Sequence, residues 1–122
     1  MERVTGIGGL FFAARDPAAL GRWYTENLGV DEPATSYGSS SWRQQAGATV
    51  LAPMPVGSEH LGPTGWAVNF RVRSLDAMVE QLSNSGTTVV VDPEHYPNGR
   101  FADLHDSEGN RIQLWEPAGA DD

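Results

Sequence analysis

Apolar positions in the first third of the chain fall into one strand-like run followed by one helix-like run. The run from Ile7 to Ala14 is largely apolar, which predicts a strand. Asp16 and Pro17 predict the start of a helix, because an aspartate side chain can cap free backbone N–H groups and proline suits the first turn. The helix is expected to end at Gly29. Its apolar face would be formed by Leu20, Trp23, Tyr24 and Leu28.

Two short strands are expected to complete the first half of the chain. They are predicted at Trp42–Gln45 and Thr49–Ala52, after the turn-rich stretch at residues 36–41. Residues 54–63 are rich in proline and glycine and are predicted to form a linker.

The second half repeats this order of elements. Trp66–Val72 predicts a strand, and Ser74 can cap a helix that would end at Gly86. The inner face of that helix would be formed by Leu75, Met78, Val79 and Leu82. Further strands are expected at Thr87–Val91, Phe101–His105 and Arg111–Trp115, the last two joined by a tight turn at residues 106–110.

The two halves share both the order and the offset of their elements. Gly9–Asp16 and Ala67–Ser74 each run from a strand into a helix cap, and Leu20 and Met78 open the two apolar helix faces at the same offset. Neither half could bury much apolar surface alone, whereas two together could. We therefore predict one α+β domain over residues 1–122, built from two βαβββ modules at about 5–53 and 64–117.

The composition of the chain excludes several classes of function. The chain has 122 residues, a net charge of −8 and no cysteine, which excludes disulfides, thiolate nucleophiles and zinc–thiolate sites. Only 8 basic residues are present and they do not cluster, so no nucleic-acid partner is expected. No signal-like apolar core opens the chain and no apolar run reaches the length of a membrane span, so we expect a cytoplasmic protein with no membrane partner.

Three motifs together resemble one known family. They are the helix motif from Asp16-Pro17 through Trp23-Tyr24 to Leu28-Gly29, the segment Asn69-Phe70-Arg71-Val72, and the closing hairpin Gly99-Arg100-Phe101 with residues 105–117. In this order they resemble the glyoxalase / bleomycin resistance protein / dioxygenase (vicinal oxygen chelate) superfamily. The resemblance implies paired βαβββ modules that form a curled mixed sheet around a cleft. It also implies a homodimer, for which Trp66 and Trp115 are candidate contact residues.

The resemblance also implies where a metal would bind in metal-dependent members of that superfamily. Carried over one by one, the four ligand positions fall on Gly9, about Leu51, Ala67 and Gln113. Gly, Leu and Ala side chains cannot ligate a metal, and one neutral amide oxygen does not hold a divalent ion alone. We therefore expect no metal and no other cofactor.

Side-chain alternation along the strands predicts what faces the cleft instead. The expected ligand-binding residues are Phe11, Asn69, Phe101, Asp103 and Gln113. Arg71 should share the face of Asn69, and Arg111 and Trp115 that of Gln113.

Two of the cleft-side residues are candidates for catalysis. Asp103 could act as an acid or base, or could instead sit at the strand edge paired with Arg100 or Arg111. His105 could assist in catalysis or serve only as a hydrogen-bonding structural residue.

Four functions remain open at this point. The first is a protein that binds a small molecule without a metal, and the acidity of the chain would suit a cationic ligand. The second is a metal-independent acid–base enzyme that uses Asp103. The third is a metal-dependent lyase or dioxygenase with a relocated site at His60, Glu59 or His105. The fourth is a structural or partner-binding role, and whether the chain is an enzyme stays undecided.

Overall fold

Both predicted helices form, and each begins at the capping residue that the sequence indicates. A computed structural model describes all 122 residues. Helix α1 spans Pro17–Leu28; Asp16 accepts a hydrogen bond from the Ala19 amide at 3.1 Å, and Gly29 ends the helix with a φ of 72°. Helix α2 spans Leu75–Asn84, capped by the Ser74 side chain.

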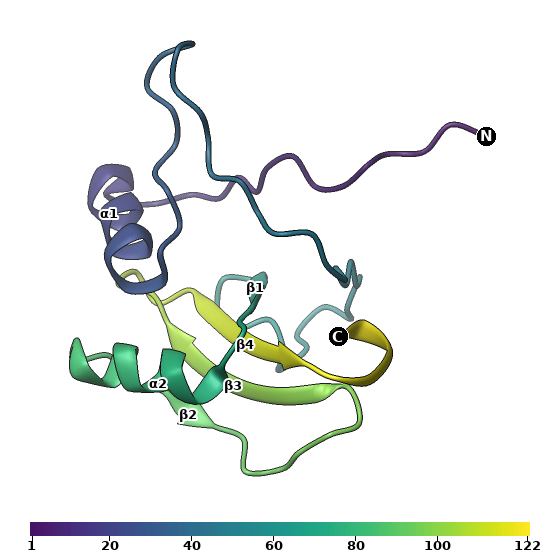
Figure 1. The fold of residues 1–122 in the computed structure, drawn as a ribbon. Helices are drawn as coiled ribbons and strands as arrows, with labels where there is room; N and C mark the ends of the chain where they lie inside the picture. Colours follow the sequence, from purple (N-terminus) through teal and green to yellow (C-terminus); the bar gives the residue numbers. More distant parts are fainter.

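The second half of the chain forms a four-stranded mixed sheet with the order β1-β4-β3-β2. The strands are β1 (Ala67–Arg71), β2 (Val90–Val91), β3 (Gly99–His105) and β4 (Arg111–Pro117), followed by a short 3₁₀ helix η1 (Gly119–Asp121). Strands β1 and β4 are parallel and the other pairs are antiparallel. Figure 1 shows α2 lying along this sheet, which is curled but not closed. The α+β fold class is confirmed, although β2 is shorter than the predicted strand.

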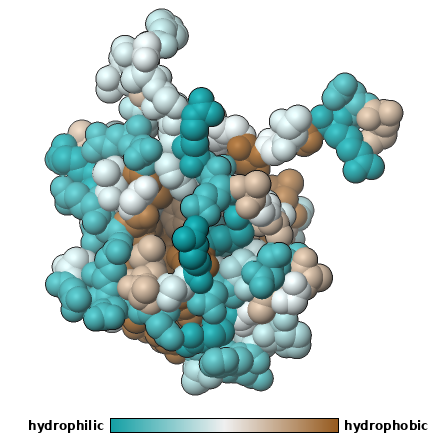
Figure 2. All heavy atoms as spheres, viewed as in Figure 1, coloured by the Kyte–Doolittle hydropathy of each residue, from teal (hydrophilic) through white to brown (hydrophobic).

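The strands predicted in the first half are wrong for this structure. Residues 7–14, 42–45 and 49–52 form no strand and pair with no other segment. A strand is stable only where its backbone N–H and C=O groups meet a partner ladder, and these segments run as long connections that join no ladder of the sheet (Figure 1). In the same view, Figure 2 shows two stretches of chain that project from the body of the molecule. Because all four strands lie in the second half, the two-module repeat stays a prediction.

One apolar core joins both helices to one face of the sheet. Its buried members are Leu20 and Tyr24 from α1, Leu75 and Leu82 from α2, Ala102 and Leu104 from β3, and Ile112 and Leu114 from β4. Because both helices contribute to a single cluster, they cover the same face, and the opposite face carries no helix. No helix is long and apolar enough to cross a membrane.

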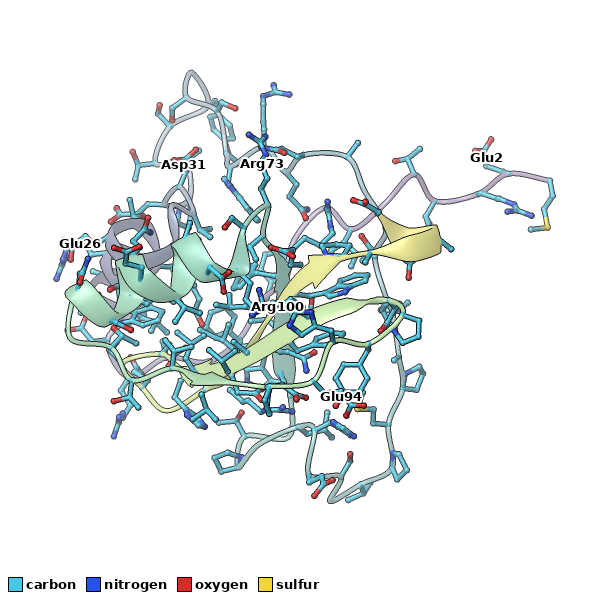
Figure 3. All side chains as sticks on the ribbon, turned by 60° about the horizontal axis from the view of Figure 1, so that its bottom comes forward. Glu2, Glu26, Asp31, Arg73, Glu94 and Arg100 are labelled. Atoms are coloured by element: carbon cyan, nitrogen blue, oxygen red, sulfur yellow. The ribbon has the colours of Figure 1, made fainter.

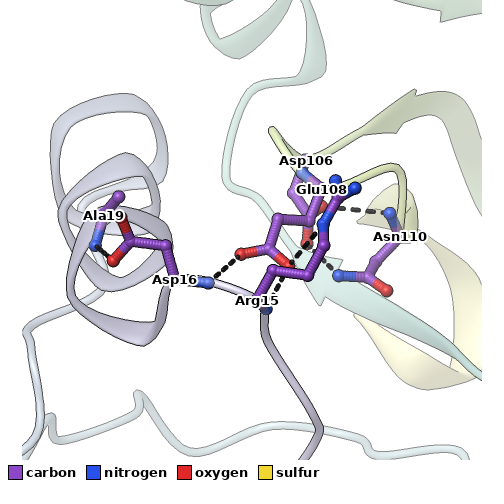
Figure 4. Close-up of polar contacts among 6 residues, drawn as sticks. All are labelled: Arg15, Asp16, Ala19, Asp106, Glu108 and Asn110. Carbon is purple, nitrogen blue, oxygen red and sulfur yellow. Dashed lines mark hydrogen bonds and ion pairs between the residues drawn. The ribbon is translucent and has the colours of Figure 1, made fainter.

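The turn between β3 and β4 holds α1 in place (Figure 4). The Glu108 carboxylate accepts hydrogen bonds from the backbone amides of Arg15 at 2.6 Å and Asp16 at 3.0 Å. These amide contacts, with the Arg15 side chain nearby, lower the pKa of Glu108.

A second contact from this turn reaches the buried side of α1. The Tyr24 hydroxyl donates to the Asp106 carboxylate at 2.6 Å, and Asp106 also accepts from the amides of Glu108 and Asn110 and from the Asn110 side chain. Burial, followed by this hydrogen bond, raises the pKa of Tyr24 above its usual value of 10.0.

Removing the Tyr24 hydroxyl should weaken the whole fold. We expect Tyr24→Phe to lower the free energy of unfolding by about 1–3 kcal/mol, because a buried hydrogen bond to a charged acceptor is lost. Tyr37→Phe is the matched control: Tyr37 is 112% exposed and its change should cost less than about 0.5 kcal/mol. Urea unfolding measures both. Equal effects for the two variants would show that the Tyr24–Asp106 bond contributes nothing to stability.

The lowered pKa of Glu108 predicts a dependence of stability on pH. A carboxylate whose pKa is lower in the folded state stabilises the protein above its unfolded pKa, near 4.5, and this contribution is lost as the pH falls through the folded value. Glu108→Gln should therefore flatten the fall in stability on acidification below about pH 4.5. The control Glu80→Gln, at an exposed helix position, should leave the curve unchanged. Parallel pH curves for wild type and Glu108→Gln would contradict this role.

Candidate functional site

The face of the sheet opposite the helices carries three rows of side chains. Strand register sets these rows, because residues paired across β1, β4 and β3 point to the same side. From one end to the other they are the aromatic row (Arg71, Trp115, Phe101), the amide row (Asn69, Gln113, Asp103) and the third row (Ala67, Arg111, His105). The face thus collects four of the five predicted ligand-binding residues: Asn69, Phe101, Asp103 and Gln113.

The amide row is linked by a direct hydrogen bond. The Asn69 side-chain amide donates to the Gln113 side-chain oxygen at 2.8 Å. Gln113 is also the register partner of Asp103 on its other side. The row therefore offers amide and carboxylate groups side by side across three strands.

Asp103 is paired with an arginine, as one of the two sequence interpretations allowed. Its carboxylate accepts from Arg111 at 2.6 Å, and it is 39% exposed. Arg100, the other possible partner, lies instead on the helix side and pairs with Asp76 at 3.1 Å. Figure 3 shows Arg100 close to the sheet beneath α2. His105 is exposed at the end of β3.

The aromatic row is built on a parallel ring pair. The rings of Phe101 and Trp115 are inclined by only 2°, with centroids 6.2 Å apart, and Tyr96 meets Phe101 edge-on at 5.9 Å. The Trp115 indole donates to the Asn98 carbonyl at 2.8 Å. Trp115 is only 3% exposed, because the rest of its own chain covers it. It therefore does not fit the predicted role as a contact to a second subunit.

An ionised carboxylate lies next to this row. The Tyr96 hydroxyl donates to Asp92 at 2.8 Å, and the Glu94 amide also donates to Asp92. The Glu94 amide contact and then the tyrosine contact lower the pKa of Asp92, while the bond to Asp92 raises the pKa of Tyr96 to about 12. The Asp92 amide donates to the Phe101 carbonyl, so this acid borders the β3 end of the aromatic row.

Two arginines hold the long connection between α1 and β1 over the face. Arg71 donates to the Gln45 carbonyl at 3.0 Å, and its guanidinium fills the space where a side chain at Gly47 would project. Arg111 donates to the His60 carbonyl in addition to Asp103. The polar rim of the face is therefore built partly from residues 45–62.

Phe11 is not brought to this face. Its side chain is 95% exposed and lies in the wall of a separate hollow of about 500 Å³ with Phe12, Trp66 and Asn110. The physical reason is the absence of a strand at residues 7–14, without which nothing aligns Phe11 with β1 and β4. Trp66 is half-buried and packs on Phe12, with ring centroids 4.6 Å apart.

The side chains present do not fit a divalent metal ion. Gly9 and Leu51 lie outside the sheet, Ala67 offers no ligand atom, and the Gln113 oxygen is already bound by Asn69. No three His, Asp or Glu side chains gather closely enough to hold an ion, and His60, Glu59 and His105 form no such group.

Comparison with known proteins settles the family. Residues 9–115 match the family model described as a glyoxalase-like domain, which spans most of the chain. The chain belongs to the glyoxalase-like domain family. This glyoxalase-like chain is also 37% identical, over 126 aligned positions, to the anthracycline biosynthesis protein DnrV of Streptomyces peucetius. That alignment covers 95% of the chain but only 40% of DnrV, so the chain spans well under half the length of this relative.

Two solved structures share the fold of this glyoxalase-like domain. TnmS3, an antibiotic binding protein from Streptomyces sp. CB03234, aligns with a TM-score of 0.63 at 19% identity, over 97% of this chain and 100% of its own. A glyoxylase/bleomycin resistance protein/dioxygenase domain from Frankia sp. EAN1pec aligns with a TM-score of 0.59 at 19% identity, over 94% and 99%. At this identity both likenesses establish the fold alone.

Three features of the face were not predicted from the sequence: the row that Arg71 shares with its neighbours, and the positions of Tyr96 and of Asp92. Alternation places Arg71 beside Asn69, but its row with Trp115 and Phe101 depends on strand register. Tyr96 and Asp92 come from the loop before β3, for which no periodic pattern exists.

Proposed function

We propose that this glyoxalase-like domain binds an organic small molecule on the helix-free face of its sheet, without a metal ion. The observation that carries the proposal is the placing of an aromatic row directly beside an amide row on one face. Small-molecule sites combine apolar or aromatic surface with a few fixed polar groups, and this face offers both.

The polar groups of the face are already oriented. Asn69 is tied to Gln113, and Asp103 to Arg111, so little side-chain freedom remains to be lost when a ligand binds. The half-exposed Phe101 ring, supported by Trp115 and Tyr96, provides the flat apolar surface.

The class of ligand we propose is a planar aromatic molecule of the polyketide type. The 37% identity to a protein of anthracycline biosynthesis supports it, since anthracyclines carry a flat fused-ring system. The aromatic row gives such rings a matching surface.

Binding is favoured over acid–base catalysis by the contacts of Asp103. Its carboxylate accepts a hydrogen bond from Arg111 at 2.6 Å, so one of its two oxygens is already occupied. The exposed His105, on the adjacent row, is not held against it by any hydrogen bond. We therefore assign Asp103 to binding.

Replacing Phe101 should weaken the binding of a planar aromatic probe. With 2-(hydroxymethyl)anthraquinone, we expect Phe101→Ala to raise Kd about tenfold through loss of ring contact, as measured by quenching of tryptophan fluorescence in excess EDTA. Phe11→Ala is the matched control and should leave Kd unchanged. Loss of binding in EDTA alone would contradict metal independence, and an effect of Phe11→Ala alone would move the site to the hollow beside Phe12.

We further propose that the chain forms a homodimer through apolar side chains of its first half. Val50 and Leu51 are 69% and 84% exposed on segments without a strand partner, and covering such side chains is favourable. A second copy is the occupant we propose, because identical chains present the same patch to each other.

Sedimentation velocity tests this assembly. We expect a dimer at micromolar concentration that Leu51→Glu shifts toward monomer, because burying an unpaired carboxylate is costly. Val56→Glu, at a turn position that is 104% exposed, should leave the dimer intact. A wild-type chain that sediments as a monomer would overturn the proposal.

A further inference from the structure

The helix-free face differs in charge from the chain as a whole. The chain carries a net charge of −8, but the three rows contain two arginines, Arg71 and Arg111, against one acid, Asp103. Arg111 and Asp103 neutralise each other at 2.6 Å. Arg71 has no acidic partner, so its positive charge remains uncompensated.

We propose that Arg71 selects planar aromatic ligands that carry an acidic oxygen, a carboxylate or an ionised phenol, at the β1 edge of the aromatic row. This inference rests on the proposed binding function and adds the charge of the ligand and its orientation. It runs against the cationic ligand that the acidity of the chain suggests.

The geometry leaves Arg71 able to bind such a group. A guanidinium has five N–H donors, and in this structure Arg71 uses one hydrogen bond, to the Gln45 carbonyl. The remaining donors match the two oxygens of a carboxylate, and a pair of this kind is stronger than one between neutral groups. Arg71 is half-buried, so water screens its charge less than that of an exposed arginine.

The opposite end of the row favours a single orientation. Asp92 borders Phe101 on the far side from Arg71 and is kept ionised by the Tyr96 hydroxyl and the Glu94 amide. An acidic substituent would be repelled at that end and attracted at the Arg71 end. Phe101, supported by the buried Trp115, lies between these two ends and contacts the rings.

Gly47 leaves the space that the Arg71 guanidinium occupies. A side chain at residue 47 would collide with the Arg71 guanidinium, which the bare glycine accommodates. Gly47→Ala should therefore displace Arg71 without removing its charge, which separates the position of the group from the charge itself.

Three probes with one ring system and different charges test the inference. They are anthraquinone-2-carboxylate, neutral 2-(hydroxymethyl)anthraquinone and cationic 2-(aminomethyl)anthraquinone, titrated into the full chain with Kd measured by calorimetry. We expect the carboxylate to bind about tenfold more tightly than the neutral probe, and the cation to bind most weakly. Added salt should weaken only the binding of the carboxylate.

The variants assign this preference to Arg71. Arg71→Gln should remove the advantage of the carboxylate over the neutral probe, which is a loss of about tenfold in the ratio of the two Kd values. Arg73→Gln makes the same change in net charge at an exposed residue that points away from the sheet (Figure 3), and it should have no such effect. Gly47→Ala should reproduce part of the loss seen with Arg71→Gln.

The outcomes separate this inference from the proposed function. If none of the probes binds, the proposed function fails. If the neutral or cationic probe binds as tightly as the carboxylate to the wild-type chain, the role of Arg71 is overturned and the binding function stands. The ranking of the probes on the wild-type chain decides this even if a variant does not fold. If Arg73→Gln loses as much of the carboxylate advantage as Arg71→Gln, the preference comes from overall charge, and the role of Arg71 is overturned.

Discussion

The β3–β4 turn is the point on which the arrangement of this chain depends, because α1 has no strand of its own half to pack against. Asp106 accepts the Tyr24 hydroxyl at the buried side of α1, while Glu108 accepts the two amides that lead into the helix. Both acids come from one tight turn, so the turn sets the position and the direction of α1 together. With α1 docked, the apolar core closes over one face of the sheet and leaves the other without a helix.

The helix-free face belongs to a glyoxalase-like fold, but its side chains differ from those expected in metal-dependent members of the superfamily. Where metal-dependent members of the superfamily are expected to place ligands, this chain has Gly9, Leu51, Ala67 and Gln113. The Gln113 oxygen is taken by Asn69, and the neighbouring acid by Arg111. The polar groups of the face therefore bind one another.

Charge on this face is arranged locally and does not follow the acidity of the whole chain. Arg71 and Arg111 each hold part of the connection between α1 and β1 through a backbone carbonyl. Only Arg111 is also paired with an acid. The same two side chains thus shape the rim of the face and set its charge, so net charge alone is a poor guide to the ligand.

The sequence by itself determined both helices, their caps, the long strands of the second half and the family, because each depends on local spacing or on a contiguous motif. Alternation also identified four of the side chains on the helix-free face, including Asn69 and Gln113. Only the tertiary structure decided that Arg111 is the partner of Asp103, that Trp115 is buried, and that Arg71, Trp115 and Phe101 share a row, since strand register and side-chain reach are not local properties. The first-half strands and the place of Phe11 were mispredicted for the same reason: a strand pattern states what a segment can pair with, and the fold decides whether a partner is present.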